Sequence, residues 1–328
     1  MSTGELTAPG PRSPQSPGRR TGPQESSASW RLSDRIGLAF AWFLGLLFCA
    51  ICASIVVFLM IQGLRYLHPD LLWTNPKVGT TQNETGGFLA DLIGTFLVAV
   101  TALVIAVPVG TGVAVWLSEY ARPAAFARVV ESTVEMLAGI PSIVLALFGL
   151  IIFQSPILGF LSQTNAGIVY GKSFFAAGAM LSLLALPFVV ASVREGLQAI
   201  PNHVREASYA LGKTKIATIR RILLPSTRPS VITGTMLGAG HVIGDTAIIV
   251  FLLGDTYKLQ PAGGFPLLNL LRGAGSTMTS FIWDNAPTGD LNQPQKAYAA
   301  AFVLMVIVVI LNVVVDVFGR KARDHRWT

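Results

Sequence analysis

Long runs of apolar residues without any charge constrain this chain more than any other feature. The first such run extends from Ile36 to Gly63. A bilayer core about 30 Å thick needs about 20 helical residues, and five further segments supply or approach that length: Leu92–Leu117, Ile140–Phe153, Phe174–Val193, Pro229–Leu253 and Ala297–Val315. These runs predict an all-α polytopic membrane protein with about six transmembrane helices. Because Pro141 and Pro156 flank the third segment, it is either a plain span or a short or broken helix.

Composition agrees with this prediction and excludes several classes of function. Only 12% of the 328 residues are charged, whereas soluble domains carry about a quarter. The net charge of +7 does not indicate nucleic acid, since the basic residues lie mostly at the flanks of the apolar runs. Cys49 and Cys52 form no disulfide or metal-ligand pattern, the four histidines are scattered, and no Gly-x-x-x-x-Gly-Lys-Ser/Thr phosphate loop occurs. We therefore expect no catalytic residue, no metal and no cofactor bound by this chain.

The distribution of charge and apolar runs predicts the domain organisation. We expect a disordered cytoplasmic tail at 1–30, rich in Pro, Ser, Gly and Thr, and a first transmembrane helix with an external loop at 31–85. A five-helix core at 86–319 and a second cytoplasmic tail at 320–328 follow. Lys and Arg in alternate flanks number 18 on one side and 6 on the other. Since cytoplasmic loops are enriched in these residues, both termini are predicted to be cytoplasmic.

The basic loop at 194–228 has the pattern of a helical hairpin. Pro201 suits a first helical turn, and Gly212 can end that helix in the left-handed conformation. Thr214 can cap a second helix, which Pro225 stops. One face of the first helix is predicted to carry Val204, Ala207, Ser208 and Leu211, and the second an apolar edge of Ile216, Ile219 and Leu223. Such a hairpin can dock in a groove of another protein or lie on the membrane surface, and the local pattern favours neither.

The same loop resembles a known motif. Glu206-Ala207-Ser208, Gly212 and Ile222-x-Leu224-Pro225 are similar to the EAA loop of binding-protein-dependent ABC importer permeases, with Ser208 in place of the second Ala. The resemblance implies the type I ABC importer permease fold. It also implies that the segment Glu206 to Gly212 is a coupling helix that sits in a cleft of a separate ATPase.

Further motifs resemble one branch of that family, the phosphate importer permeases. They are Gly86-Gly87-Phe88 before Ile93-Gly94-Thr95, Leu117-Ser118-Glu119-Tyr120-Ala121, Ala138-Gly139-Ile140-Pro141-Ser142-Ile143-Val144, Ile232-Thr233-Gly234, Ile243-Gly244-Asp245-Thr246-Ala247 and Ala297-Tyr298-Ala299-Ala300. Thr233-Gly234 and the phenylalanine-rich third segment favour the PstA-type over the PstC-type subunit.

The resemblance implies both a function and a set of partners. The chain would import inorganic phosphate across a bacterial or archaeal cytoplasmic membrane, in contact with its lipids. It would pair with a PstC-type permease, be driven by a cytoplasmic ATPase dimer that binds ATP-Mg, and receive phosphate from an extracytoplasmic binding protein.

The fifth apolar segment contains two ionisable residues, His241 and Asp245, with Thr246 beside them. A spacing of four places the pair on one helical face. Ionisable groups inside a membrane helix usually face a bundle interior or a water-filled path. We expect the three residues to line or gate the translocation path, with the pair acting as an ion pair that breaks and re-forms; a static polar clasp between subunits is the alternative. Four glycines in the segment favour close helix approach: Gly234, Gly238, Gly240 and Gly244.

Two positions depart from the family pattern. In similar phosphate permeases the positions of His241 and Asp245 usually carry Arg and Glu. Arginine stays charged and binds oxyanions with two parallel hydrogen bonds, whereas histidine titrates near neutrality. Transport of another oxyanion, such as molybdate, sulfate or phosphonate, is therefore an alternative. A self-sufficient secondary transporter would show internal repeats or several intramembrane charge pairs, which the sequence lacks, and a scaffold without transport leaves the polar pair unexplained.

The stretch Asp255 to Lys296 is predicted to be external. It either offers a docking surface for the binding protein, with Gly263-Gly264-Phe265-Pro266 and Ser280-Phe281-Ile282-Trp283, or packs on the chain's own helices. Lys258 and Arg272 could steer an anion there.

Overall fold

The computed structural model describes residues 32–75, 86–155, 157–164, 167–168, 171–254, 266–289 and 293–324. The predicted tail at 1–30, the loop positions Lys258 and 263–265, and residues 325–328 of the second tail lie outside this part. The chain divides into two compact units, Met1–Val57 and Phe58–Thr328. Helix α1 (Leu32–Tyr66) crosses that boundary. Its apolar side chains in the first unit are exposed, as expected for a helix whose solvent is lipid.

The second unit is almost entirely helical. In chain order it contains α2 (Pro69–Trp73), α3 (Leu89–Val115), η2 (Trp116–Tyr120), α4 (Ala124–Gly139), α5 (Ser142–Gln154), η3 (Gly159–Leu161), β1 (Gln163–Thr164), β2 (Gly167–Ile168), α6 (Phe174–Gln198), α7 (Asn202–Ala210), α8 (Lys215–Thr218), η4 (Ile219–Leu223), α9 (Leu224–Ser226), α10 (Arg228–Gly244), α11 (Ala247–Leu252), α12 (Pro266–Arg272), α13 (Met278–Asn285) and α14 (Pro294–Asp324). The antiparallel pair β1–β2 has only two residues in each strand, so the all-α prediction holds for the architecture.

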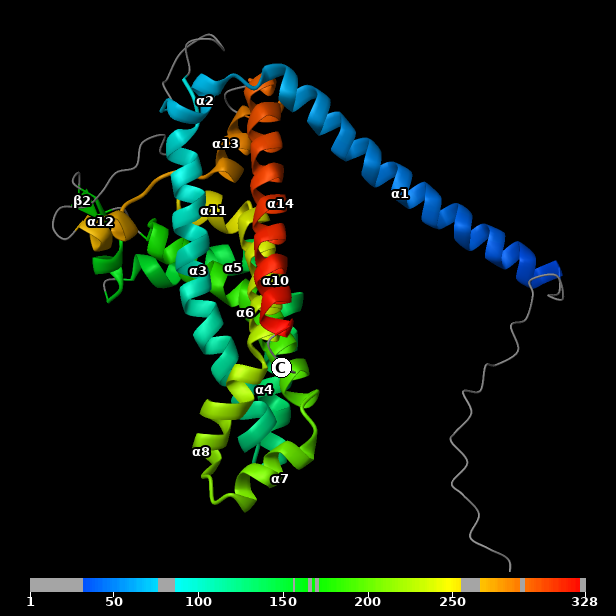
Figure 1. The fold of residues 1–328 in the computed structure, drawn as a ribbon. Helices are drawn as coiled ribbons and strands as arrows, with labels where there is room; N and C mark the ends of the chain where they lie inside the picture. The colour runs from blue at the N-terminus through cyan, green and yellow to red at the C-terminus, as the bar shows by residue number, and fades with distance from the viewer. Residues whose placement is uncertain are drawn as a thin grey trace, which may run out of the picture. The chain divides into compact units, whose positions relative to one another are not determined.

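Helices α3, α6 and α10 form the centre of the second unit (Figure 1). They bury a common apolar core with α5 and α11, to which the five helices contribute Val98, Leu145, Leu181, Val242 and Leu252. Ser173 caps α6 by accepting the amide hydrogen of Ala176 at 3.1 Å, which satisfies one of the free N–H groups at the helix start. This core positions the loop that follows α6 and the break that follows α10.

Glycines allow α10 to pack closely on α6. A Cβ at Gly238 would lie 3.1 Å from the Cβ of Ala185, and one at Gly234 would meet the α6 backbone even more closely. The prediction of close approach is confirmed for these two positions. Around Gly240 and Gly244 a Cβ would meet no atom of the described residues within 4 Å.

Helices α4 and α5 meet at a bend of 105°. The bend falls at Ile140 and Pro141, whose extended backbone ends α4 and precedes α5. Proline cannot donate its amide to the preceding turn and disfavours helical backbone in the residue before it. The third predicted segment is therefore the second arm of a bent pair, which agrees with its prediction as a broken span.

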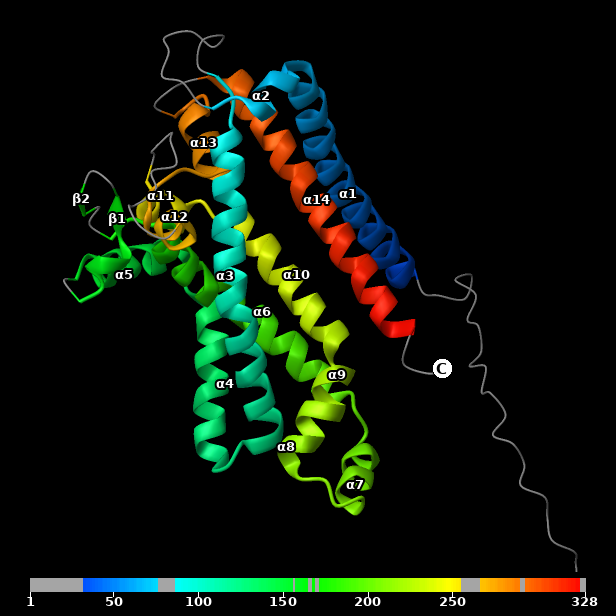
Figure 2. The same ribbon diagram turned by 60° about the vertical axis from the view of Figure 1, so that its left-hand side comes forward.

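The two ends of the second unit differ in construction. Helices α7 and α8 lie at one end, and α2 and α13 lie at the opposite end (Figures 1 and 2). At the α13 end the hydroxyl of Ser276 donates to the carboxylate of buried Asp91, and the amide of Met278 donates to Thr95 Oγ1 at 2.9 Å. Phe281 is buried there as well. This part of the predicted external stretch thus packs on the chain's own helices.

Four helices of the described chain are long and apolar enough to cross a membrane, or five spans if the bent pair counts as one. The four lie within Asp34–Tyr66, Leu89–Tyr120, Phe174–Gln198 and Pro294–Val314. The fifth predicted span, Pro229–Leu253, is divided into α10 and α11. The prediction of one continuous helix there is wrong.

Candidate functional site

The loop after α6 folds as the predicted helical hairpin, which comprises α7, α8, η4 and α9. Pro201 precedes α7, and the chain reverses at Gly212, whose φ is +73°. The amide of Gly212 donates to the carbonyl of Tyr209 at 2.9 Å, and that of Lys213 to Ser208 at 3.2 Å. Because left-handed backbone favours glycine, Gly212 ends α7 as predicted.

The second half of the hairpin begins at the predicted cap. Thr214 Oγ1 accepts the amide hydrogen of Ala217 at 3.3 Å. The chain then continues through α8, the π-helical turn η4 and the short α9, which ends at Ser226, one residue after the predicted stop at Pro225. Ile219 and Leu223 of the predicted apolar edge are buried, whereas Ile216 is 69% exposed.

A hydrogen bond between two hydroxyl groups joins the halves of the hairpin. Ser208 Oγ lies 2.8 Å from Thr218 Oγ1, and both residues are buried. Thr218 Oγ1 also donates to the carbonyl of Thr214 at 3.1 Å. The serine that departs from the EAA pattern therefore has a specific partner inside the hairpin. An alanine at this position would leave that partner with one bond fewer.

The outer surface of the hairpin presents apolar side chains. Leu211 is 80% exposed and Tyr209 is also exposed. Glu206 and Ala207 are exposed beside them. Of the face predicted for the first helix, only Ser208 is fully buried. The other motif residues, Ile222, Leu224 and Pro225, are half-buried on the second half of the hairpin.

The three residues predicted for the translocation path lie at the break between α10 and α11. Helix α10 ends at Gly244, and Asp245 has extended backbone with φ −75° and ψ 128°. Asp245 Oδ1 accepts the amide hydrogen of Ile248 at 2.8 Å, and Thr246 immediately precedes α11. Since a short carboxylate side chain competes with the helix for backbone amides, Asp245 starts a new helix instead of continuing α10.

His241 is exposed on the last turn of α10, and its ring centroid lies 5.1 Å from that of Phe188. Among the described residues, no ion pair joins His241 to Asp245. Asp245 is the C-cap residue of α10, four positions after His241, and its carboxylate caps α11 instead of pairing with the histidine. Their role in the translocation path stays a prediction.

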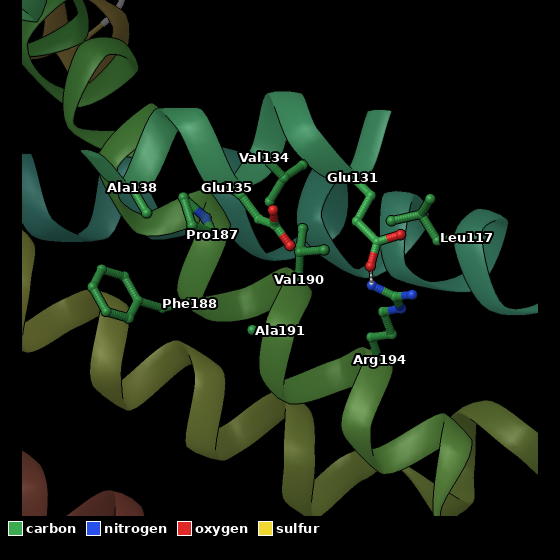
Figure 3. A pocket seen from close by; sticks show the side chains of 10 residues that line it. All are labelled: Leu117, Glu131, Val134, Glu135, Ala138, Pro187, Phe188, Val190, Ala191 and Arg194. Atoms are coloured by element: carbon green, nitrogen blue, oxygen red, sulfur yellow. Dashed lines mark hydrogen bonds and ion pairs between the residues drawn. The ribbon is translucent and has the colours of Figure 1, made fainter. Parts of the chain in front are cut away.

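A cavity of about 300 Å³ lies between α4 and α6, and Phe188 is part of its wall (Figure 3). Most of its lining is apolar, with Glu135 from α4 and an ion pair between Glu131 of α4 and Arg194 of α6 as the charged groups. Arg194 belongs to the predicted basic loop, whereas no sequence motif indicated Glu131. Glu131 lies on α4, which falls between two of the predicted apolar segments. Only the alternation of apolar and charged residues along this amphipathic helix could have indicated it. Phe188, which forms part of the cavity wall, also contacts the His241 ring.

No group of three or more His, Cys, Asp or Glu side chains in the described ranges could hold a metal ion. The candidate site has two parts. The first is the helical hairpin with its exposed apolar surface, and the second is the polar break between α10 and α11, near the cavity wall at Phe188. This combination defines a polytopic membrane protein of the transporter class, with an appended element suited to docking.

The comparisons with known proteins identify the class further. Residues 106–324 match the family described as "Binding-protein-dependent transport system inner membrane component", and the chain belongs to this family. The phosphate transport system permease PstC of Xylella fastidiosa is 31% identical over 270 residues, covering 77% of this chain and 76% of the relative. PstA 1 of Mycobacterium tuberculosis is 34% identical over 241 residues, covering 73% and 72%.

Solved structures show the same fold. A chain of the bacterial alginate ABC transporter, in complex with an alginate pentasaccharide-bound periplasmic protein, superposes with a TM-score of 0.59 at 17% identity, covering 89% of this chain and 98% of that one. A chain of the inward-facing MetNI methionine ABC transporter gives 0.54 at 19% identity, covering 72% and 94%. The chain is therefore a multi-pass membrane permease subunit with the fold of ABC importer permeases.

Proposed function

We propose that this chain is one permease subunit of an ATP-driven importer of inorganic phosphate. The observation that carries this proposal is the similarity, over about three-quarters of the chain, to permeases named for phosphate transport. The fold supports the transport class, and the hairpin supplies the element through which a separate ATPase would act. ATP-Mg binds to that ATPase, while this chain provides the path and the mechanical connection.

The exposed surface of the hairpin supports a role in docking to the ATPase. Leu211 and Ile216 are among the most exposed large apolar residues outside α1. Helices α7 and α8 of the hairpin lie at one end of the second unit, opposite α2 and α13 (Figure 2). Burying these two side chains in a protein cleft would gain about 1.5–3 kcal/mol each. Ala207 and Glu206 lie beside them, and a small side chain there allows close backbone approach. We assign ATPase coupling to Glu206, Ala207, Ser208, Gly212, Ile222, Leu224 and Pro225.

The break between α10 and α11 supports a role in the translocation path. Unwound backbone inside a membrane is tolerated where it is buried in protein or lines a water-filled cavity. His241, Asp245 and Thr246 surround this break and are not fully buried within the single chain. A protonated His241 could guide an anion, while Asp245 would hold the break through its cap to α11. Movement of the hairpin would open or close this region.

The charge distribution supports an assembly with both termini in the cytoplasm. The hairpin, with its arginines and lysines, would face the same side as the termini. A second, PstC-type permease would complete the path, and an extracytoplasmic phosphate-binding protein would deliver the substrate. The relatives carry both PstA and PstC names; Thr233-Gly234 and the phenylalanine-rich third segment favour the PstA type for this chain.

The experiment that tests the substrate uses the purified complex, reconstituted with its ATPase, second permease and binding protein. Phosphate should stimulate ATP hydrolysis and accumulate in the liposomes, whereas molybdate, sulfate and phosphonate should not. Stimulation by one of those anions instead would reassign the substrate. Uptake by this chain alone would support a secondary transporter.

A matched pair of variants tests the role of His241. His241→Ala should reduce phosphate uptake, because no cationic side chain remains on that turn, and His241→Arg should preserve it. Equal uptake by the wild type and His241→Ala would show that His241 has no role in the translocation path.

A further inference from the structure

The end of α3 contains a motif to which the proposed function gives no role, Leu117-Ser118-Glu119-Tyr120-Ala121. Helix α3 continues here into the π-helical turn η2, and the side chain of Glu119 is only 6% exposed. A carboxylate withdrawn from water in this way needs a charged or hydrogen-bonding partner. Its partners come from the helical hairpin, far along the chain.

Arg205 of α7 bonds both to Glu119 and to the end of α6. Its Nε donates to Glu119 Oε1 at 3.0 Å, and its Nη1 and Nη2 donate to the carbonyls of Ile200 at 2.7 Å and Leu197 at 2.9 Å. The carbonyl of Leu197 belongs to the last turn of α6 and also accepts the amide hydrogen of Ile200 at 3.3 Å, so the guanidinium adds a second bond there. The planar guanidinium thus fixes α7 against two membrane helices at once.

Lys215 of α8 makes the second attachment to the same place. Its Nζ donates to the backbone carbonyl of Glu119 and lies 4.5 Å from the centroid of the Tyr120 ring, a cation–π distance. Both halves of the helical hairpin are therefore attached to two consecutive residues at the end of α3.

The helical hairpin also contacts α6, since Arg205 bonds to Leu197 and the buried Ile219 and Leu223 share an apolar cluster with the C-terminal half of α6. The contacts with Glu119 and Tyr120 attach both of its halves to the end of α3. The Arg205 side chain is 17% exposed, so the pair with Glu119 is largely shielded from solvent and salt. Removing one partner would leave the other charge buried and uncompensated.

We propose that Glu119 and Arg205 are positioning residues that hold the helical hairpin and the end of α3 together as one rigid body throughout the transport cycle. A displacement of the hairpin by the ATPase is then delivered directly to α3, and Lys215 prevents rotation about the first attachment. This inference rests on the proposed function, because it assigns the route by which coupling enters the membrane helices.

The first test compares substitutions in the complete reconstituted complex. Glu119→Gln should leave the ATPase bound, as judged by copurification, and should lower phosphate uptake per ATP hydrolysed by about tenfold or more, since it unpairs a buried arginine. Lys215→Met should lower it by a smaller factor, about threefold, because the cation–π contact and one hydrogen bond are lost. The matched control is Arg128→Gln on α4, an exposed arginine that should transport like the wild type.

The second test replaces the ion pair by a covalent link. In a Cys49→Ser, Cys52→Ser background, Glu119→Cys and Arg205→Cys are joined by a bifunctional, reducible thiol reagent long enough to span two side chains. The double variant should lose coupling, regain it when linked, and lose it again on reduction. If the double variant were simply misfolded, linking the two cysteines would not restore uptake per ATP hydrolysed, and reduction would not abolish it again.

Three results would overturn the inference. They are wild-type coupling in Glu119→Gln, wild-type coupling in Lys215→Met, or a linked complex that holds the ATPase but does not regain uptake, which would mean that the two segments must separate during the cycle. A wild-type complex that hydrolyses ATP without taking up phosphate contradicts the proposed function instead. The anion that stimulates ATP hydrolysis by the wild-type complex would then be used in place of phosphate to compare the wild type with Glu119→Gln and Lys215→Met.

Discussion

Replacing Gly234 by alanine should weaken the packing of α10 on α6. A Cβ at this position would lie 2.9 Å from the Cα of Val189, 3.0 Å from the Cβ of Ser192 and 3.1 Å from the carbonyl oxygen of Phe188. None of these atoms can move away by a side-chain rotation, so the helices must shift apart. Overpacking of this kind costs about 1–3 kcal/mol, and the higher helix propensity of alanine returns about 1 kcal/mol at most. We expect Gly234→Ala to destabilise the protein by about 1–2 kcal/mol.

Gly240→Ala is the matched control on the same helix. A Cβ there meets no described atom within 4 Å, so the substitution should be neutral or stabilising by up to about 1 kcal/mol. Equilibrium unfolding of the purified chain in mixed micelles with increasing SDS measures both variants against the wild type. If Gly234→Ala were as stable as Gly240→Ala, the close packing of α10 on α6 would be refuted.

Three further predictions follow from the contacts of the site. Asp245→Asn should keep the cap on α11 and therefore phosphate uptake, whereas Asp245→Ala should lose uptake and also about 1 kcal/mol of stability in SDS unfolding; loss of uptake in the Asn variant would show that the charge, and not the cap, is required. Ser208→Ala should remove the hydrogen bond to Thr218, which contributes about 1 kcal/mol to stability. The rate of amide hydrogen exchange in the helical hairpin should then rise about fivefold; an unchanged rate would contradict this. Glu131→Gln should cost less than about 1 kcal/mol, because its pair with Arg194 is about one-third exposed, and the cost should fall at high salt; a large, salt-independent loss would speak against a solvated pair.

Local rules predicted the helical hairpin in detail. The left-handed Gly212 and the cap at Thr214 each depend on backbone conformation over a few neighbouring residues, and the structure has both. Pro201 lies directly before α7 instead of in its first turn. The apolar runs likewise predicted the long helices, because the length of a span is set by the thickness of the bilayer. These features needed no knowledge of tertiary contacts.

Other features could not be obtained from such rules. Helical spacing placed Asp245 on the face of His241, but the aspartate carboxylate caps the next helix, and apolar periodicity does not detect this competition. The attachment of Arg205 to Glu119 joins residues 86 positions apart, so no local pattern contains it. Helical spacing also places Leu211 on one face with Val204, Ala207 and Ser208, yet only Ser208 of this face is buried and Leu211 is 80% exposed.

The most direct test of the account places a photo-activatable cross-linking residue at position 211 in the intact complex. Leu211 is 80% exposed at the end of α7, so the probe would replace a side chain that has lost little packing. Illumination of the membranes should capture the ATPase subunit, and a thiol reagent should reach Leu211→Cys, in a background lacking Cys49 and Cys52, from the cytoplasmic side only. Labelling from the outside, or a cross-link that never contains an ATPase, would contradict the assignment of the helical hairpin as the coupling element.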